Sequence, residues 1–321
     1  MLSLNELAHR RCELLAEHLA QRMHMHAGVL RMDCGARVID CGVNASGGLE
    51  IGRQLAEICL ADLGRVSFVP GSADVWSGPA VAVHTDQPIA ACMASQYAGW
   101  QIAGEKFFAM GSGPMRAAAG KEKIFDHIGY RETASHAVGV LESSKLPPDD
   151  VCRKIAADCK IEPANLTLLV ARTASIAGSV QVVARTVETA LHKMHELGFD
   201  LSRVQSGFGI APLPPIAKDD LAGIGRTNDA VLYGGEVTLW IRGDDETMAT
   251  LGPQIPASAS RDYGEPFAAI FERAGKDFYK IDPLLFSPGV VNLVNLDSGT
   301  FHRFGQLRPD ALKKSFTSSS S

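Results

Sequence analysis

Apolar residues recur at helical spacing in the first part of the chain. Over residues 4–24, leucines alternate with Glu, Arg and His in the manner of an amphipathic helix. Charged residues interrupt this stretch, so it lacks the unbroken apolar core of a secretory signal. Nowhere do about twenty apolar residues follow one another, and the sequence therefore predicts no membrane-spanning helix.

Short apolar runs and helical stretches share the remaining chain. Helices are predicted at residues 50–63 and 175–197, the second ending at Gly198. A rigid loop rich in Gly and Pro is predicted at residues 206–215. Because the elements do not follow one another as regular βαβ units, we expect an α/β fold of the α+β kind with mixed sheets. The runs typical of strands are residues 29–32, 36–41, 66–69, 80–84, 89–93, 107–110, 165–170 and 231–241.

The first half of the chain is weakly similar to the second. In each half a predicted strand leads into a Ser- and Ala-Gly-containing turn, at Ser95 and at Ser175, and then into a helix and a Gly-rich turn. This pattern predicts a two-lobed subunit with a cleft between the lobes, arising from an internal duplication; chance similarity is the alternative. We expect lobes centred on residues 30–145 and 150–300 within one catalytic unit of residues 1–316, followed by a disordered tail at 317–321.

Charge and cysteine content exclude several classes of protein. The formal net charge is −5 and the Lys and Arg residues are scattered, which disfavours nucleic acid as a partner. The seven cysteines are odd in number and no two have CxxC spacing, so neither a disulfide framework nor a zinc knuckle is predicted. Thiols of this kind indicate a reducing cytoplasm.

Arg185 and Glu188 are the first candidates for chemistry. They stand three residues apart in the predicted helix, so their side chains share one face. A carboxylate beside a guanidinium stays ionised, and burial against an apolar ligand raises its pKa again, so such a group can take a proton from water. Small neighbours such as Ala177 and Gly178 would let a flat ligand approach. The alternative is a surface pair worth roughly 0.2–0.5 kcal/mol.

Glu188, His192 and His195 also have a spacing found in metal sites. There is no HExxH motif, and a further ligand would have to come from elsewhere in the chain. The alternative is a solvated helix end whose basic residues interact favourably with the helix dipole. We therefore predict no metal.

Three Gly-rich segments could contact a ligand or merely turn the chain. Residues 111–116 present backbone N–H groups and one Arg, which suits an anion, but they match neither a Walker motif nor GxGxxG. Residues 44–48 precede a predicted helix, and residues 223–229 precede a predicted strand. No GxSxG motif or cysteine nucleophile signature is present, so covalent catalysis is not indicated.

Several segments together resemble the methenyltetrahydromethanopterin cyclohydrolase family. They occur in order and span nearly the whole chain. They are residues 94–102, 111–117, 172–188, 209–215, 225–235 and 277–288.

The resemblance implies reversible hydrolysis of the methenyl bridge of 5,10-methenyl-tetrahydromethanopterin to the 5-formyl form. It implies no metal and no cofactor, the tetrahydromethanopterin derivative being the substrate carrier. It also implies a homotrimer with the pterin in the cleft. From the scattered basic residues and the lack of long apolar runs we expect neither nucleic acid nor a membrane as partner. The family's catalytic Arg-x-x-Glu pair falls on Arg185 and Glu188, with Glu188 as general base and Arg185 orienting it.

Further residues in the resembling segments and the Gly-rich turns are candidates for substrate binding. The amide of Gln96 suits ring nitrogens, although each position could equally be a structural turn. The alternative functions are a non-catalytic pterin-carrier binding protein and a metal-dependent amidohydrolase using His192 and His195. The candidates are Ser95, Gln96, Ala98, Gly99, Gly111, Ser112, Gly113, Arg116, Asn44, Ser46, Arg226 and Asn228.

Overall fold

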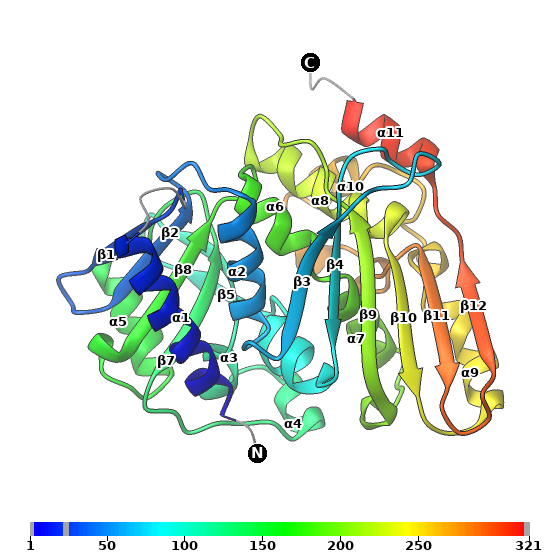
Figure 1. Ribbon diagram of the computed structural model, residues 1–321, viewed down its shortest axis with the longest axis horizontal. Coiled ribbons are helices and arrows are strands. Elements are labelled where there is room, and N and C mark those ends of the chain that lie inside the picture. Colours follow the sequence, from blue (N-terminus) through cyan, green and yellow to red (C-terminus); the bar gives the residue numbers. More distant parts are fainter. Residues whose placement is uncertain (1–2, 22–25, 318–321) are drawn as a thin grey trace. The chain divides into compact units, whose positions relative to one another are not determined.

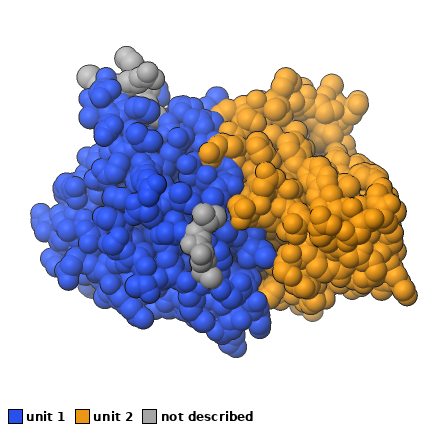
Figure 2. All heavy atoms as spheres, turned by 60° about the horizontal axis from the view of Figure 1, so that its bottom comes forward, with its two compact units in different colours: residues 1–64, 89–181 blue, residues 65–88, 182–321 orange. Residues whose placement is uncertain are grey.

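Two six-stranded sheets organise the chain. The computed structural model describes residues 3–21 and 26–317. These residues form two units: unit 1 comprises residues 1–64 and 89–181, and unit 2 comprises residues 65–88 and 182–321 (Figure 2). Each sheet mixes parallel and antiparallel strand pairs, which confirms the predicted fold class. The predicted cleft, the internal duplication and the catalytic-unit boundaries stay predictions, and residues 318–321 of the predicted tail lie outside the described residues.

The sheet of unit 1 has the strand order β1-β2-β8-β7-β6-β5. Its three strands β2, β8 and β7 run parallel to one another, and the remaining pairs are antiparallel. These three strands are buried almost without interruption, as expected for parallel strands covered on both faces. The bounds are β1 (Gly28–Arg31), β2 (Arg37–Gly42), β5 (Trp100–Ala103), β6 (Phe108–Ser112), β7 (Ala137–Glu142) and β8 (Leu166–Ala171).

Helices cover both faces of this sheet (Figure 1). Ile39 and Leu169 pack on one face with apolar residues of α1 and α2, whereas their neighbours Val38 and Leu168 pack on the other face with α5. Alternate residues of one strand therefore serve two separate apolar clusters. The bounds are α1 (Leu4–Gln21), α2 (Leu49–Cys59), α3 (Met115–Ala119), α4 (Ile124–Ile128) and α5 (Asp149–Asp158).

The N-terminus of α1 is held by a carboxylate from a distant loop. Glu132 accepts hydrogen bonds from the backbone N–H groups of Leu4 at 3.1 Å and Asn5 at 3.3 Å, which no residue within the helix can satisfy. The side chain of Asn5 in turn donates to the carbonyl oxygen of Pro114 at 2.9 Å and accepts from the N–H of Val138 at 3.0 Å. Glu132 and Asn5 thus attach α1 to the rest of unit 1.

We expect Glu132→Ala to lower the free energy of unfolding by about 1–2 kcal/mol, since it removes a helix-capping carboxylate. Chemical denaturation followed by circular dichroism measures this change. Glu17→Ala is the control, because Glu17 lies exposed on the same helix. Equal denaturation midpoints for the two variants would show that the cap does not stabilise α1.

The sheet of unit 2 has the strand order β12-β11-β10-β9-β4-β3. Buried and partly exposed residues alternate strictly along β10, which indicates that one face packs inward and the other faces outward. Helix α7 contacts β9 and β10 on the inner face, and it lies behind them in Figure 1. The bounds are β3 (Gly64–Val69), β4 (Ala80–Thr85), β9 (Val204–Pro212), β10 (Glu236–Ile241), β11 (Val290–Asn295) and β12 (Phe301–Gly305).

Most helices of unit 2 follow its longest strand. Helix α8 packs against both α10 and α11, and α6 contains the point where the chain passes from unit 1 to unit 2. The bounds are α6 (Ile176–Val183), α7 (Thr186–Glu196), α8 (Asp220–Gly234), α9 (Asp245–Leu251), α10 (Phe267–Arg273) and α11 (Pro309–Thr317). Single 3₁₀ turns occur at Pro163–Asn165, Leu201–Arg203, Gly252–Gln254, Ala257–Ala259, Phe278–Lys280 and Pro283–Leu285.

Two of the predicted strands and one predicted loop differ from the structure. The expected strand at 89–93 is a π-helix, Ile89–Gln96, because a short run that is apolar all round fits a buried helix as well as a strand. The expected strand at 231–241 begins only at Glu236, since its apolar start belongs to the buried side of α8. The expected loop at 206–215 is mostly β9.

The other predicted strands lie within two residues of their observed bounds. Helix α1 agrees with the helix expected at 4–24 as far as Gln21, and residues 22–24 lie outside the described residues. The helix expected at 50–63 forms but ends at Cys59. In the part of the chain that the structure describes, no helix combines the length and the apolar character needed to cross a membrane.

Candidate functional site

The segment that carries Arg185 and Glu188 is two helices rather than one. Helix α6 ends at Val183 and α7 begins at Thr186, so the expected continuous helix over 175–197 is wrong. The Thr186 hydroxyl donates a hydrogen bond to the carbonyl oxygen of Val183 at 2.9 Å. This bond satisfies a carbonyl group at the end of α6, where the helical segment is interrupted. Arg185 immediately precedes α7, and Glu188 lies in its first turn, where the helix dipole favours a negative charge.

Arg185 and Glu188 form a buried ion pair. Nη1 of Arg185 lies 3.8 Å from Oε2 of Glu188, and the two side chains are 9% and 4% exposed. Burial strengthens their attraction relative to a pair in water, and it excludes the alternative of a solvated surface pair. At this distance the contact is an ion pair rather than a hydrogen bond. The pair therefore offers a carboxylate that is fixed near a positive charge and shielded from bulk water.

Two glycines of β9 allow the start of α7 to lie close to the sheet. A Cβ atom on Gly207 would come within 2.6 Å of Cγ1 of Val187, and one on Gly209 would come within 2.9 Å of Cβ of Thr186. Both separations are shorter than van der Waals contact, so a side chain at either position would displace α7. This role was not predicted from the sequence, although alternating glycines inside a run that can form a strand are the signal for such a close approach.

We expect Gly209→Ala to lower the turnover number about tenfold, because shifting Thr186 also shifts Arg185 and Glu188. Steady-state kinetics and a thermal denaturation midpoint, measured on the same sample, separate a displaced pair from an unfolded protein. Gln205→Ala is the control, since Gln205 is exposed on the same strand. A variant with wild-type turnover would show that the approach of α7 does not set the geometry of the pair.

A lysine and a carbonyl oxygen attach α7 to a neighbouring turn. The Lys193 side chain is buried, and its Nζ donates a hydrogen bond to the carbonyl oxygen of Leu284. Burial lowers the pKa of Lys193 to about 8, and the nearby carboxylate of Asp282 acts in the opposite direction. Nothing in the sequence pattern marks this lysine as buried.

The candidates around Arg116 belong to a buried network of unit 1. Arg116 donates from Nε and Nη2 to the two carboxylate oxygens of Glu122 at 2.8 Å and 2.7 Å, and from Nη1 to the carbonyl oxygens of Met93 at 2.9 Å and Ser95 at 3.2 Å. The Ser95 hydroxyl donates to the carbonyl oxygen of Cys59 at 2.6 Å. These contacts favour a structural role for Arg116, because internal acceptors already bind its guanidinium.

The structure brings other predicted residues into this same network. The N–H of Gly113 donates to the carbonyl oxygen of Ser95 at 2.8 Å, and Oγ of Ser112 lies 3.3 Å from Sγ of Cys59. A Cβ atom on Gly99 would meet a carboxylate oxygen of Glu122 at 2.0 Å. Ser95, Gln96 and Ser112 are fully buried, Gly111 is buried in β6, and Ala98 is half-buried. Their binding roles stay predictions.

Asn44 and Ser46 line a cavity of about 450 Å³ in unit 1. The cavity lies at the carboxyl end of β2, the edge at which open sheets with parallel strands usually bind ligands. The carboxylate of Asp40 accepts hydrogen bonds from four consecutive backbone N–H groups at residues 42–45, at 2.7–3.0 Å. Oγ of Ser46 lies 3.0 Å from Nδ1 of His26. Because the N–H groups face Asp40, this loop suits a neutral or cationic group better than an anion.

Arg226 and Asn228 lie on α8 in unit 2. Nη1 of Arg226 donates to the carbonyl oxygens of Pro215 and Ile216, each at 3.2 Å. Nδ2 of Asn228 donates to the carbonyl oxygen of Ile224, one turn earlier, at 2.9 Å. Both side chains are half-buried, and their role in binding stays a prediction.

Asp229, the next residue on α8, was missed by the sequence analysis. Its side chain is buried, and Oδ1 accepts the N–H of Phe267 at 2.9 Å, at the first residue of α10. Burial raises the pKa of Asp229 to about 7, although hydrogen bonds from Ser315 and Phe267 act against the shift. Asp229 therefore connects α8 with α10 and α11. Its carboxyl group is buried, and its pKa lies near neutrality.

Nothing in the described residues forms a cluster of three or more His, Cys, Asp or Glu side chains suited to a metal. Nε2 of His192 lies 3.7 Å from Oε1 of Glu196, a carboxylate at the exposed end of α7. The predicted independence from metal stays a prediction.

Comparison with known proteins identifies the family. The family described as Cyclohydrolase (MCH) matches residues 3–316. The chain belongs to this cyclohydrolase family. A protein of Methylobacillus flagellatus named methenyltetrahydromethanopterin cyclohydrolase is 48% identical over 288 residues, covering 90% of this chain and 88% of the relative. Proteins with the same name from Rhodopirellula baltica and Methanosarcina barkeri are 50% and 42% identical, covering 88% and 98% of this chain and 86% and 98% of their own lengths.

Membership in the cyclohydrolase family confirms the resemblance inferred from the sequence. The match covers residues of both units, so the buried pair of α7 and the buried network of unit 1 lie within the matched residues 3–316.

Proposed function

We propose that this chain is a methenyltetrahydromethanopterin cyclohydrolase, which reversibly hydrolyses the methenyl bridge of 5,10-methenyl-tetrahydromethanopterin to the 5-formyl form. The observation that carries the proposal is the family match over residues 3–316. The buried pair of Arg185 and Glu188 supports it, because hydrolysis of such a bridge requires a shielded, positioned base.

The reaction requires little more from the protein than a base and a surface that binds the substrate. The methenyl carbon bridges two nitrogens, carries positive charge and is already electrophilic. A water oxygen bonds to this carbon, the bond from carbon to one nitrogen breaks, and the formyl group remains on the other nitrogen. One proton of the water is transferred to the leaving nitrogen, and the second is released to solvent. The reaction needs no oxidant, and we propose that it needs neither metal nor cofactor.

In this proposal Glu188 is the general base. Its carboxylate takes the proton from water as the oxygen attacks, and it returns a proton to the leaving nitrogen. Its negative charge also attracts the cationic substrate. Arg185 orients the carboxylate and favours its ionised form through the contact at 3.8 Å. We further propose a homotrimer in the cytoplasm.

Loss of the methenyl chromophore on mixing tests the function directly. We expect ultraviolet absorbance of methenyl-tetrahydromethanopterin to decay in proportion to protein concentration, faster than that of the folate counterpart, and unchanged by a chelator. Binding with the chromophore intact would favour the pterin-carrier binding protein. Decay that a chelator abolishes would favour the metal-dependent amidohydrolase.

A further inference from the structure

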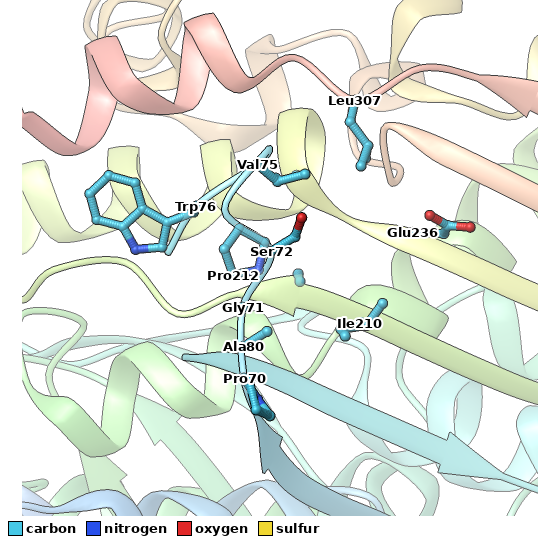
Figure 3. A pocket seen from close by; sticks show the side chains of 12 residues that line it. Pro70, Gly71, Ser72, Val75, Trp76, Ala80, Ile210, Pro212, Glu236 and Leu307 are labelled. Carbon is cyan, nitrogen blue, oxygen red and sulfur yellow. The ribbon is translucent and has the colours of Figure 1, made fainter. Parts of the chain in front are cut away.

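A cavity of about 270 Å³ in unit 2 contains a charge that the protein already compensates (Figure 3). Its wall is mainly apolar, and the loop that joins β3 to β4 contributes Val75 and Trp76 to it. Glu236 is the charged residue of the wall, and it accepts hydrogen bonds from Nη1 of Arg303 at 2.6 Å and from Nδ2 of Asn292 at 2.9 Å. A pair of titratable side chains in unit 1 differs from this arrangement, because both members of the pair would carry positive charge.

His9 on α1 and His136, which immediately precedes β7, are stacked on each other. Their ring centroids are 3.8 Å apart, the ring planes differ by 9°, and both side chains are half-buried. Oγ of Ser135 lies 3.2 Å from Nδ1 of His136, whereas Nδ1 of His9 is buried and has no hydrogen-bond partner among the described residues. Because the rings lie face to face, their nitrogen atoms do not converge on one point, and the pair is not suited to hold a metal ion between them.

The stacked pair is part of the contact that holds α1 on the sheet of unit 1. Asn5 lies one turn before His9 on the same face of α1, and its Oδ1 accepts the N–H of Val138 at 3.0 Å. Val138 and His136 are alternate residues at the start of β7, so α1 follows the chain from one contact to the next. Val138 also belongs to an apolar cluster that α1 covers, and loss of the stacked contact would weaken this cover. The residues of α1 in the cluster are Ala8, Cys12 and Leu15.

The carboxylates near the pair are already bound to arginines. Glu13 accepts a hydrogen bond from Nη1 of Arg37, and Glu6 accepts one from Nε of Arg10 at 3.1 Å. Burial, the imidazole stacked against it and Arg37 lower the pKa of His9, although the two carboxylates act in the opposite direction. The charged residues on the elements that pack against α1 are Arg31 on β1, Glu50, Arg53 and Glu57 on α2, Arg116 on α3 and Glu142 on β7, and the capping carboxylate is that of Glu132.

Protonation of both rings would place two positive charges face to face. Two like charges at this separation disfavour the contact, and a half-buried site screens them less than water does. A histidine in water takes up a proton near pH 6.5. Below this pH the attached state of α1 therefore binds fewer protons than an open state in which the rings are separated. The contact is thus most stable above about pH 6.5 and weakens as the pH falls.

We propose that the stacked pair of His9 and His136 is a pH-sensitive contact, which holds α1 on the sheet of unit 1 near neutral pH and releases it in mild acid. Release of α1 uncovers the apolar cluster that contains Cys12. The contact involves neither Arg185 nor Glu188, so the proposal is tested without an activity assay. Its failure would leave the proposed function unaffected, and failure of the proposed function would leave this contact unaffected.

Hydrogen–deuterium exchange of peptides from α1, measured by mass spectrometry and corrected for the intrinsic exchange rate at each pH, tests the proposal. We expect the equilibrium constant for opening of α1 in the wild type to rise about tenfold between pH 7 and pH 5. His9→Phe keeps a ring stacked on His136 but removes one of the two charges, so its opening constant should change less than about twofold over this range. His136→Phe is the reciprocal variant, and it gives the same test if His9→Phe packs poorly.

His18→Gln is the matched control, because His18 is exposed in the last turn of the same helix. This variant should open with the pH dependence of the wild type. Equal protection of wild-type α1 at pH 7 and pH 5 would overturn the proposal. Equal loss of protection in the wild type and in both Phe variants would overturn it as well, since another group, such as the carboxylate of Glu132, would then be the one that titrates.

Discussion

Replacement of Glu188 by Gln is expected to lower the turnover number about 10²–10⁴-fold, the usual contribution of a positioned general base. The amide has nearly the shape of the carboxylate but cannot accept the proton of the attacking water. Because Glu188 is buried beside Arg185, the substitution also leaves a guanidinium without its charge partner, and substrate affinity should fall less than turnover. Stopped-flow decay of the methenyl absorbance at saturating substrate measures this effect.

Glu196→Gln is the control for this prediction. Glu196 lies on the same helix, but its side chain is 39% exposed at the far end. This variant should keep the wild-type rate. If Glu188→Gln also kept it, another group would have to take the proton, and the buried pair would be structural.

Arg185→Ala tests whether the two residues act as one unit. If Arg185 works by orienting Glu188, the double variant should lose little more activity than Glu188→Gln alone, because neither residue contributes without the other. If the activity losses of the two single variants instead multiplied in the double variant, Arg185 would have a separate effect on the substrate.

Uniform burial helped to predict some strands but not all of them. The parallel strands β2 and β8 were found within a residue of their bounds, whereas β7, which is buried to the same extent, was not predicted. The residues of the candidate pair were found through their family motif. Their surroundings were not, because the break before Thr186 depends on how α7 packs against Gly207 and Gly209 of β9, a contact that links positions about twenty residues apart.

Features determined by distant partners escaped the sequence analysis. Arg116 follows a Gly-rich turn that suits an anion, yet its guanidinium binds Glu122 and two backbone carbonyl groups. The π-helix over Ile89–Gln96 is apolar on all sides, so hydrophobic periodicity could not distinguish it from a strand. Asp229 looks like a surface residue in a polar motif, and only the packing of α10 and α11 on α8 buries it.

The burial of Asp229 gives a second prediction, on the dependence of stability on pH. The folded protein holds a proton on this carboxyl up to a pKa of about 7, whereas an unfolded Asp releases it near 3.9. The folded state therefore binds more protons than the unfolded state between these values, and the free energy of unfolding contributed by this group falls as the pH rises from about 4 to about 7. The contribution is complete below pH 4 and is lost above pH 7.

Asp229→Asn should remove this dependence, because the amide stays neutral at every pH while its oxygen can still accept the N–H of Phe267. We expect the variant to be more stable than the wild type at pH 8 by up to about 4 kcal/mol, and the two to converge near pH 4. Urea denaturation at intervals between pH 4 and pH 8 gives the comparison, with Asp74→Asn, an exposed residue of unit 2, as control. Parallel stability curves for Asp229→Asn and the wild type would show that Asp229 is ionised in the folded protein at neutral pH, and that its charge is compensated within the contact between α8 and α10.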